Sequence, residues 1–163
     1  MITEKQKYAL NQVITALPDK YREAFRGVAE YTVSLGYAPK LNAKGTYADF
    51  VKSKHGKTIL KIDTAASPPR LAIRFDTLLE YSGMFQEAVE NRVDLLEKSD
   101  WFKGSCHGCG KCDGTQGYAY ALNDGRKGFF CGSGVIDLPP FDDESISAIK
   151  DALKAEDDYL TNR

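Results

Sequence analysis

Four cysteines set the strongest constraint on this chain, because they fall close together with the spacing Cys106-x2-Cys109-x2-Cys112-x18-Cys131. Cysteines separated by two residues commonly bind zinc through a tetrahedron of sulfurs, with zinc–sulfur distances of about 2.3 Å. Glycines lie between or beside these cysteines, and glycine lets a backbone curve tightly around an ion. We therefore expect the four thiolates to bind one metal ion, and their spacing favours zinc.

The same spacing leaves two other chemistries open. Three closely spaced cysteines and a distant fourth also resemble the ligand set of an iron–sulfur cluster, although Gly132 replaces the proline that often follows the fourth cysteine of ferredoxins. Dithiol redox chemistry has less support, because the Cys-x-x-Cys pairs do not follow a strand and open a helix. His107 could replace one cysteine as a ligand, but four thiolates already fill a tetrahedral shell.

A zinc ion with four protein sulfurs has no open position for water or substrate, so such a site stabilises structure and does not catalyse. The rest of the sequence gives little sign of catalysis. The glycine that a phosphate-binding loop requires five residues before Gly56 is Val51, and the chain has only two histidines. We interpret His55 as a solvated turn residue, expect no catalytic residues and favour a protein that is not an enzyme.

Two amphipathic helices are predicted at the start of the chain. Thr3 and Gln6 have the spacing of a capping box, and apolar residues recur at helical intervals over residues 10–17. A second apolar stripe covers residues 21–35, and Gly36 can end that helix. These two helices are expected to form an N-terminal hairpin.

The middle of the chain changes from helical to strand periodicity. A short helix is predicted around residues 47–52, and alternating apolar residues predict antiparallel strands at 58–63 and 70–75. Ser82 can cap a further helix whose inward face is formed by Phe85, Val89, Val93 and Leu96.

A second hairpin is predicted to lead into the last cysteine. Residues 118–122 and 127–131 flank Asp124-Gly125, which readily forms a two-residue turn. With that turn, Cys131 would lie opposite Tyr118. After Pro139-Pro140, Asp142 or Asp143 can cap a last helix with an apolar stripe formed by Ile146, Ile149, Leu153 and Leu160.

These elements predict an α+β fold, with an antiparallel sheet of about four strands packed by the N-terminal helical hairpin, a middle helix and a C-terminal helix. A chain of 163 residues fits one domain and buries about 70% of the surface of its unfolded form. We therefore expect a single domain over residues 1–163, with the metal-binding loop on a hairpin at 104–133.

Charge is unevenly distributed, although the net charge is only −1. Residues 40–74 carry Lys40, Lys44, Lys52, Lys54, Lys57, Lys61, Arg70 and Arg74 against Asp49 and Asp63. Residues 137–160 carry Asp137, Asp142, Asp143, Glu144, Asp151, Glu156, Asp157 and Asp158 against Lys150 and Lys154. The basic tract could contact phosphates, but its aromatic residues more often fill a core. We expect an unknown protein or small-molecule partner in preference to nucleic acid.

The N-terminal residues are charged from Glu4 onward and lack the apolar core of a signal peptide. No stretch reaches the uncharged length of a membrane helix. We therefore expect a cytoplasmic protein, in whose reducing environment clustered cysteines indicate a metal more than disulfides.

Two stretches carry a family resemblance: Arg70-Leu71-Ala72-Ile73-Arg74-Phe75, and Ile136-Asp137-Leu138-Pro139-Pro140-Phe141-Asp142 running into Ile146, Ile149-Lys150 and Tyr159. They resemble the small bacterial YdhG-like proteins of unknown function, some of which are labelled frataxin-like iron carriers. The resemblance implies a compact α+β fold with helices on an antiparallel sheet. The cysteine cluster departs from the commoner members, so the iron-carrier label does not transfer to it.

The sequence thus favours a bacterial protein with a structural zinc site that serves as a binding or regulatory module. The alternative is a metal or redox carrier that uses an iron–sulfur cluster or handles iron through its acidic surface.

Overall fold

The elements of the chain follow one another in a mixed order of helices and strands. The computed structural model describes residues 3–74, 83–98, 117–131 and 134–162. In chain order the elements are α1 (Glu4–Thr15), α2 (Asp19–Ser34), β1 (Ala38–Leu41), β2 (Tyr47–Val51), β3 (Thr58–Asp63), β4 (Arg70–Ile73), α3 (Met84–Glu97), β5 (Gly117–Ala121), β6 (Lys127–Cys131), β7 (Ile136–Asp137) and α4 (Ser145–Thr161).

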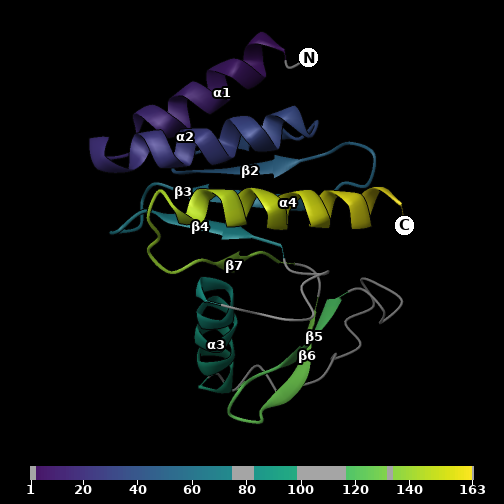
Figure 1. Cartoon of the computed structure of the whole chain (residues 1–163). Coiled ribbons are helices and arrows are strands. Elements are labelled where there is room, and N and C mark those ends of the chain that lie inside the picture. Colours follow the sequence, from purple (N-terminus) through teal and green to yellow (C-terminus); the bar gives the residue numbers. More distant parts are fainter. Residues whose placement is uncertain (1–2, 75–82, 99–116, 132–133, 163) are drawn as a thin grey trace.

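The predicted α+β class is confirmed, and so are the N-terminal helix pair, the middle helix and the C-terminal helix. Over the described ranges the main sheet has five antiparallel strands in the order β1-β2-β3-β4-β7, and β5 and β6 form a separate two-stranded sheet. The prediction of about four strands therefore needs correction, because it placed the second hairpin among the strands of one sheet. Helices α1, α2 and α4 lie over one face of the main sheet, whereas α3 and the hairpin lie beyond β7 (Figure 1).

The helix predicted at 47–52 is wrong, because Tyr47–Val51 forms strand β2, which lies between β1 and β3 in the sheet. Its burial alternates with a period of two: Ala48 and Phe50 are fully buried, and their neighbours are half-buried. The strand pairs with β1 on one side and β3 on the other. Pairing on both sides and a buried aromatic side chain favour a strand over a single helical turn.

The sheet register builds the core in rows across the strands. Phe50 pairs with Leu60, Leu60 with Ile73, and Ile73 with Ile136, so one apolar row crosses four strands. None of these four side chains is more than 2% exposed. Since successive side chains of a strand point to opposite faces, Asp49, Lys61 and Asp137 lie on the face opposite this row.

Both predicted helix ends near the N-terminus are confirmed. The Thr3 N–H donates to Gln6 Oε1 (2.7 Å) and the Gln6 N–H donates to Thr3 Oγ1 (3.3 Å), which completes the capping box of α1. Gly36 has a φ of 93° after the last turn of α2, a conformation that costs glycine little.

The two later helices also agree with their predicted faces. In α3, Val89 and Val93 are fully buried, while the predicted cap Ser82 lies outside the described residues. At the start of α4, Asp142 Oδ1 accepts a hydrogen bond from the Ser145 N–H (3.0 Å). Of the two aspartates considered for this role, Asp142 therefore makes the contact.

Proline occupies a particular position in the outer strand β1. The Asn42 N–H donates to the Tyr47 oxygen (3.1 Å), and hydrogen-bonded pairs alternate along an antiparallel ladder. Lys40 therefore faces Asp49 in a hydrogen-bonded pair, and Pro39 occupies a position whose nitrogen points away from β2. The missing N–H of Pro39 thus costs the sheet no hydrogen bond.

None of the described helices is long and apolar enough to cross a membrane.

Candidate metal centre and a buried polar cluster

The hairpin predicted ahead of the last cysteine is present as β5 and β6, and Cys131 is the last residue of β6. The other three predicted ligands, Cys106, Cys109 and Cys112, lie outside the described residues, as does His107. In the part of the chain that is described, no three histidine, cysteine, aspartate or glutamate side chains are grouped to hold a metal ion. The four-cysteine site therefore stays a prediction.

The register of this hairpin differs by one residue from the predicted register. Cys131 pairs with Gly117, and Tyr118 pairs with Phe130. The turn is longer than expected, since the Leu122 N–H donates to the Arg126 oxygen (2.8 Å) and encloses three residues. A two-residue type I′ turn would need a positive φ at both central residues, but here only Gly125 has one (91°) among residues 123–125.

Small and large side chains fit together across the hairpin. Tyr120 pairs with Gly128, and a Cβ atom added at Gly128 would lie only 2.6 Å from Tyr120 Cζ. The Tyr120 side chain and Leu122 are both buried against the main core. Glycine at 128 thus leaves room for the tyrosine ring, which helps to anchor the hairpin.

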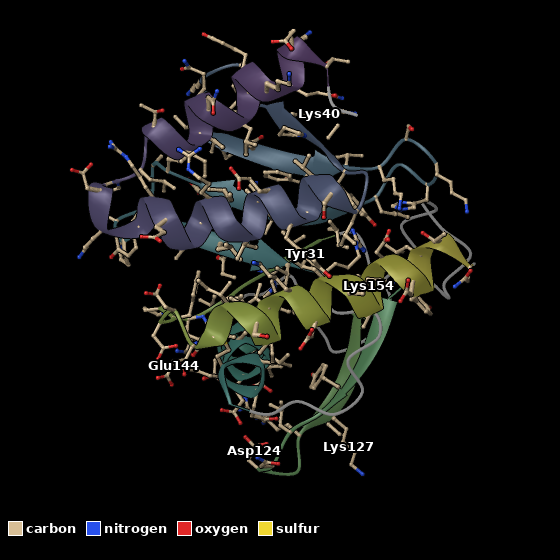
Figure 2. All side chains as sticks on the ribbon, turned by 45° about the horizontal axis from the view of Figure 1, so that its top comes forward. Tyr31, Lys40, Asp124, Lys127, Glu144 and Lys154 are labelled. Carbon is tan, nitrogen blue, oxygen red and sulfur yellow. The ribbon has the colours of Figure 1, made fainter. Side chains whose placement is uncertain are left out.

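Arg126 ties the hairpin to α3. Its guanidinium contacts Asp94 Oδ1 (2.7 Å) and Glu97 Oε2 (3.1 Å) of the helix, and Asp124 Oδ2 (2.7 Å) of its own turn. The hydrogen bonds that Arg126 donates to Asp94 and then to Asp124, together with the negative charges of Asp124 and Glu97, raise the pKa of Arg126. Figure 2 shows the tip of the hairpin, marked by Asp124 and Lys127, at the opposite end of the molecule from Lys40.

The basic tract and the acidic tract, far apart in sequence, are partly paired with each other. Lys52 Nζ lies 2.7 Å from Asp157 Oδ1 in α4. Arg70 contacts Asp137 (3.1 Å) and Asp63 (2.9 Å). The uneven charge of the sequence is therefore balanced in part within the fold.

A buried polar cluster surrounds Asp157 at the C-terminal end of α4. Tyr37 is fully buried, and its hydroxyl lies 3.2 Å from His55 Nε2. The Lys52 ammonium also lies 5.2 Å from the centre of the Tyr37 ring. Thr161 Oγ1 donates to Asp157 Oδ1 (3.3 Å), and Lys54 Nζ donates to the Thr161 carbonyl (2.9 Å).

His55 lies in a turn, as predicted, but its side chain is less solvated than expected. The residue is half-buried, and both of its ring nitrogens have partners. The Lys57 N–H donates to Nδ1 (3.1 Å), so Nδ1 carries no proton and the neutral ring carries its proton on Nε2. Nε2 then donates to the Tyr37 oxygen, and the Tyr37 hydroxyl donates to the Asp157 carboxylate.

The electrostatics of the cluster favour this one protonation state. Burial, followed by the Lys52 ammonium, lowers the pKa of His55 and keeps its ring neutral. Burial alone would raise the pKa of Asp157, but hydrogen bonds from Lys52 and Tyr37 outweigh it and lower that pKa. Burial and the Asp157 carboxylate raise the pKa of the Tyr37 hydroxyl. The result is one chain of donors that ends on a single carboxylate.

The sequence contained one signal for this cluster that the prediction did not use. The apolar stripe of α4 includes Leu153 and Leu160, and Asp157 follows Leu153 by one helical interval of four. An acidic residue on an apolar stripe is expected to be buried with a partner. Asp157 is indeed only 8% exposed, but its cationic partner Lys52 comes from a position far away in the sequence.

No family model, no curated protein and no solved structure matches this chain.

Proposed function

We propose that Cys106, Cys109, Cys112 and Cys131 bind one structural zinc ion, and that the protein is a non-enzymatic binding or regulatory module with a protein or small-molecule partner. The observation that carries the proposal is the register of the hairpin. Cys131 pairs with Gly117 at the end of the hairpin away from the turn, and Gly117 follows Cys112 by only five residues. A chain of that length spans at most about 17 Å, which is a short enough tether for Cys112 and Cys131 to bind the same ion.

The separate pairing of the hairpin strands supports a structural role for the metal. A two-stranded sheet is only marginally stable by itself in water. Here β5 and β6 are not hydrogen-bonded to the five-stranded sheet. A closed zinc site at the end of the hairpin opposite the turn would hold the strands together where Arg126 does not reach.

The alternative role of an iron or redox carrier has two parts, and the surface charges bear on one of them. Iron handling by acidic groups needs carboxylates that are free to bind cations. Asp137 and Asp157 are paired with Arg70 and Lys52, and Asp158 is paired with Lys154. The iron–sulfur version rests on the same four cysteines as zinc, and the metal content distinguishes the two.

The proposal is tested by elemental analysis of protein purified without added metal. We expect one zinc ion per chain and a colourless preparation. Cys112→Ser and Cys131→Ser should lose the metal, whereas His107→Ala is the matched control and should retain it, since a spectator histidine is not a ligand. Iron with inorganic sulfide and a brown colour would support the alternative, and four freely titrating thiols without metal would overturn both.

The resemblance to bacterial YdhG-like proteins and the cytoplasmic location remain predictions of the same proposal. A cytoplasmic location fits a set of thiolates that must stay reduced to bind zinc.

A further inference from the structure

We propose that residues 52–57 are an acid-sensitive latch that holds the last turn of α4 on the sheet and opens when His55 binds a second ring proton. The segment connects β2 to β3 and contacts α4 twice. Lys52 pairs with Asp157, and Lys54 donates to the Thr161 carbonyl. The end of α4 is therefore held by two lysines, which precede His55 by three residues (Lys52) and by one residue (Lys54).

The turn itself depends on a neutral His55 ring. His55 Nδ1 accepts the Lys57 N–H, while the Lys52 carbonyl accepts the Gly56 N–H (2.9 Å). A proton on Nδ1 converts this acceptor into a donor, and two donors then face each other across the turn. Protonation is thus incompatible with the observed hydrogen bond, so the turn must rearrange.

Charges around the ring act in the same direction. The charged and titratable groups near His55 are Lys52, Lys54 and Lys57 of its own segment, Tyr37 before β1, Arg74 after β4, and Asp157 of α4. Glu156 of α4 acts on Tyr37, the hydrogen-bond partner of His55. Lys52, Lys54 and Arg74 disfavour an imidazolium, and Asp157 favours it less strongly than Lys52 disfavours it. A charged ring would also compete with Lys52 for the Asp157 carboxylate.

The pH at which the latch opens follows from the direction of these effects. The folded protein holds the pKa of His55 below the ordinary value of about 6.5, so the unfolded or open chain binds the proton first as pH falls. The stabilising contribution of His55 is complete above about pH 6.5 and is lost as pH falls below it toward the folded pKa. For each unit between the two pKa values, opening becomes about tenfold more favourable in acid.

Asp157 does not cause this response. Its pKa lies below the usual value of about 3.9, so its stabilising contribution is present above that pH and is lost only in stronger acid. An opening of α4 between pH 6.5 and 5 is therefore not caused by Asp157, and the His55→Gln variant assigns it to His55.

The test combines the two histidine signals in proton NMR with amide exchange of α4. His55→Gln identifies the His55 signal and provides the matched control, because its amide can accept and donate hydrogen bonds but cannot be protonated. We expect His55 to titrate below its ordinary pKa, and the amides of residues 157–161 to exchange faster over the same pH range after correction for intrinsic rates. The Gln variant should lack that acceleration. An ordinary pKa, or the same acceleration in both proteins, would overturn the proposal.

Two further variants test the cause even if His55→Gln does not fold. Lys52→Met should raise the measured pKa of His55, because a repelling ammonium is removed. Asp157→Asn should lower it, because an attracting carboxylate is removed. Unchanged midpoints in both variants would contradict a latch whose state is coupled to these two groups.

Discussion

The five-stranded sheet with α1, α2 and α4 is held together in a different way from the hairpin with α3. Among the described residues, the largest fully buried side chains are Ile14, Leu17, Tyr37, Phe50, Ile59, Leu60, Ile62, Leu71, Ile73, Ile149 and Leu153. All of them belong to the sheet, to α1 and α4, or to the segments that join these elements. The sheet region is thus stabilised mainly by the burial of apolar surface.

Among the described residues, the hairpin region has a smaller core, to which α3 contributes the fully buried Val89 and Val93. From the hairpin itself, Tyr120 of β5 and the next buried residue, Leu122, belong to this core, with exposed fractions of 7% and 6%. Arg126 supplies ion pairs to α3 at the surface, and such pairs contribute little when solvent reaches them. The predicted zinc ion would therefore give the hairpin region a source of stability that the sheet region does not use.

Removal of the metal should separate the two regions most strongly. In small zinc modules the metal contributes roughly 10–16 kcal/mol of apparent binding energy, comparable to the whole stability of a typical domain of about 5–15 kcal/mol. Chelation or Cys131→Ser should therefore abolish amide protection in β5 and β6 while the strands β2 and β3 stay protected. Hydrogen exchange followed by mass spectrometry measures this. Equal loss of protection in both regions would contradict the comparison.

Within the sheet region, the largest single polar effect is expected at the cluster around Asp157. Lys52→Met leaves this mostly buried carboxylate without its cation and should lower the free energy of unfolding by about 3 kcal/mol. Lys154→Met is the matched control, because Lys154 forms an exposed pair with Asp158 on the same helix and should change nothing measurable. Urea denaturation compares the two variants, and equal effects would mean that the Lys52 pair behaves as a surface contact.

Two glycine-to-alanine changes should alter the free energy of unfolding in opposite directions, one in each region. Gly128→Ala forces the Tyr120 ring to move and should cost about 1–3 kcal/mol, mainly in the hairpin. Gly27→Ala in α2 meets no atom within 4 Å and should stabilise the sheet region by roughly 0.5–1 kcal/mol. Thermal denaturation gives both values. Stabilisation by Gly128→Ala would show that the tyrosine ring does not need this glycine.

The smallest effect is expected in the binding of nucleic acid to the basic tract. Lys52 and Arg70 of the basic tract are already paired with carboxylates, so any binding of random DNA or RNA should be weak and should disappear as salt rises. Mobility shifts at low and physiological salt measure it. Binding that survives physiological salt and distinguishes sequences would show that the paired charges still leave a nucleic-acid surface.

Elements whose signal is local could be predicted from the sequence. The capping box at Thr3, the end of α2 at Gly36 and the buried valines of α3 each depend on residues within one or two turns. The strands β3 and β4 were also predicted, because their alternation of apolar residues is regular. In each case the determining interactions lie close together in the chain.

Elements defined by distant partners could not be predicted in this way. Strand β1 contains Pro39, and β7 has two residues, so neither shows a period, and each exists because a neighbouring strand pairs with it. Strand β2 is predicted as a helix because its five residues carry no sign of their pairing with β1 and β3. For the buried cluster, the contact between Lys52 and Asp157 joins positions 105 residues apart.

The place of Pro39 in the outer strand has a consequence for assembly. Exposed strand edges recruit further strands through their free N–H groups, which leads to strand addition by partners or to aggregation. Within β1 only Leu41 has an N–H that points outward, because the nitrogen of Pro39 carries no hydrogen. At the opposite edge, β7 is two residues long and is soon followed by Pro139-Pro140. Both edges of the five-stranded sheet therefore resist its growth, and a partner of this protein is expected to bind side chains there and not to add a strand to that sheet.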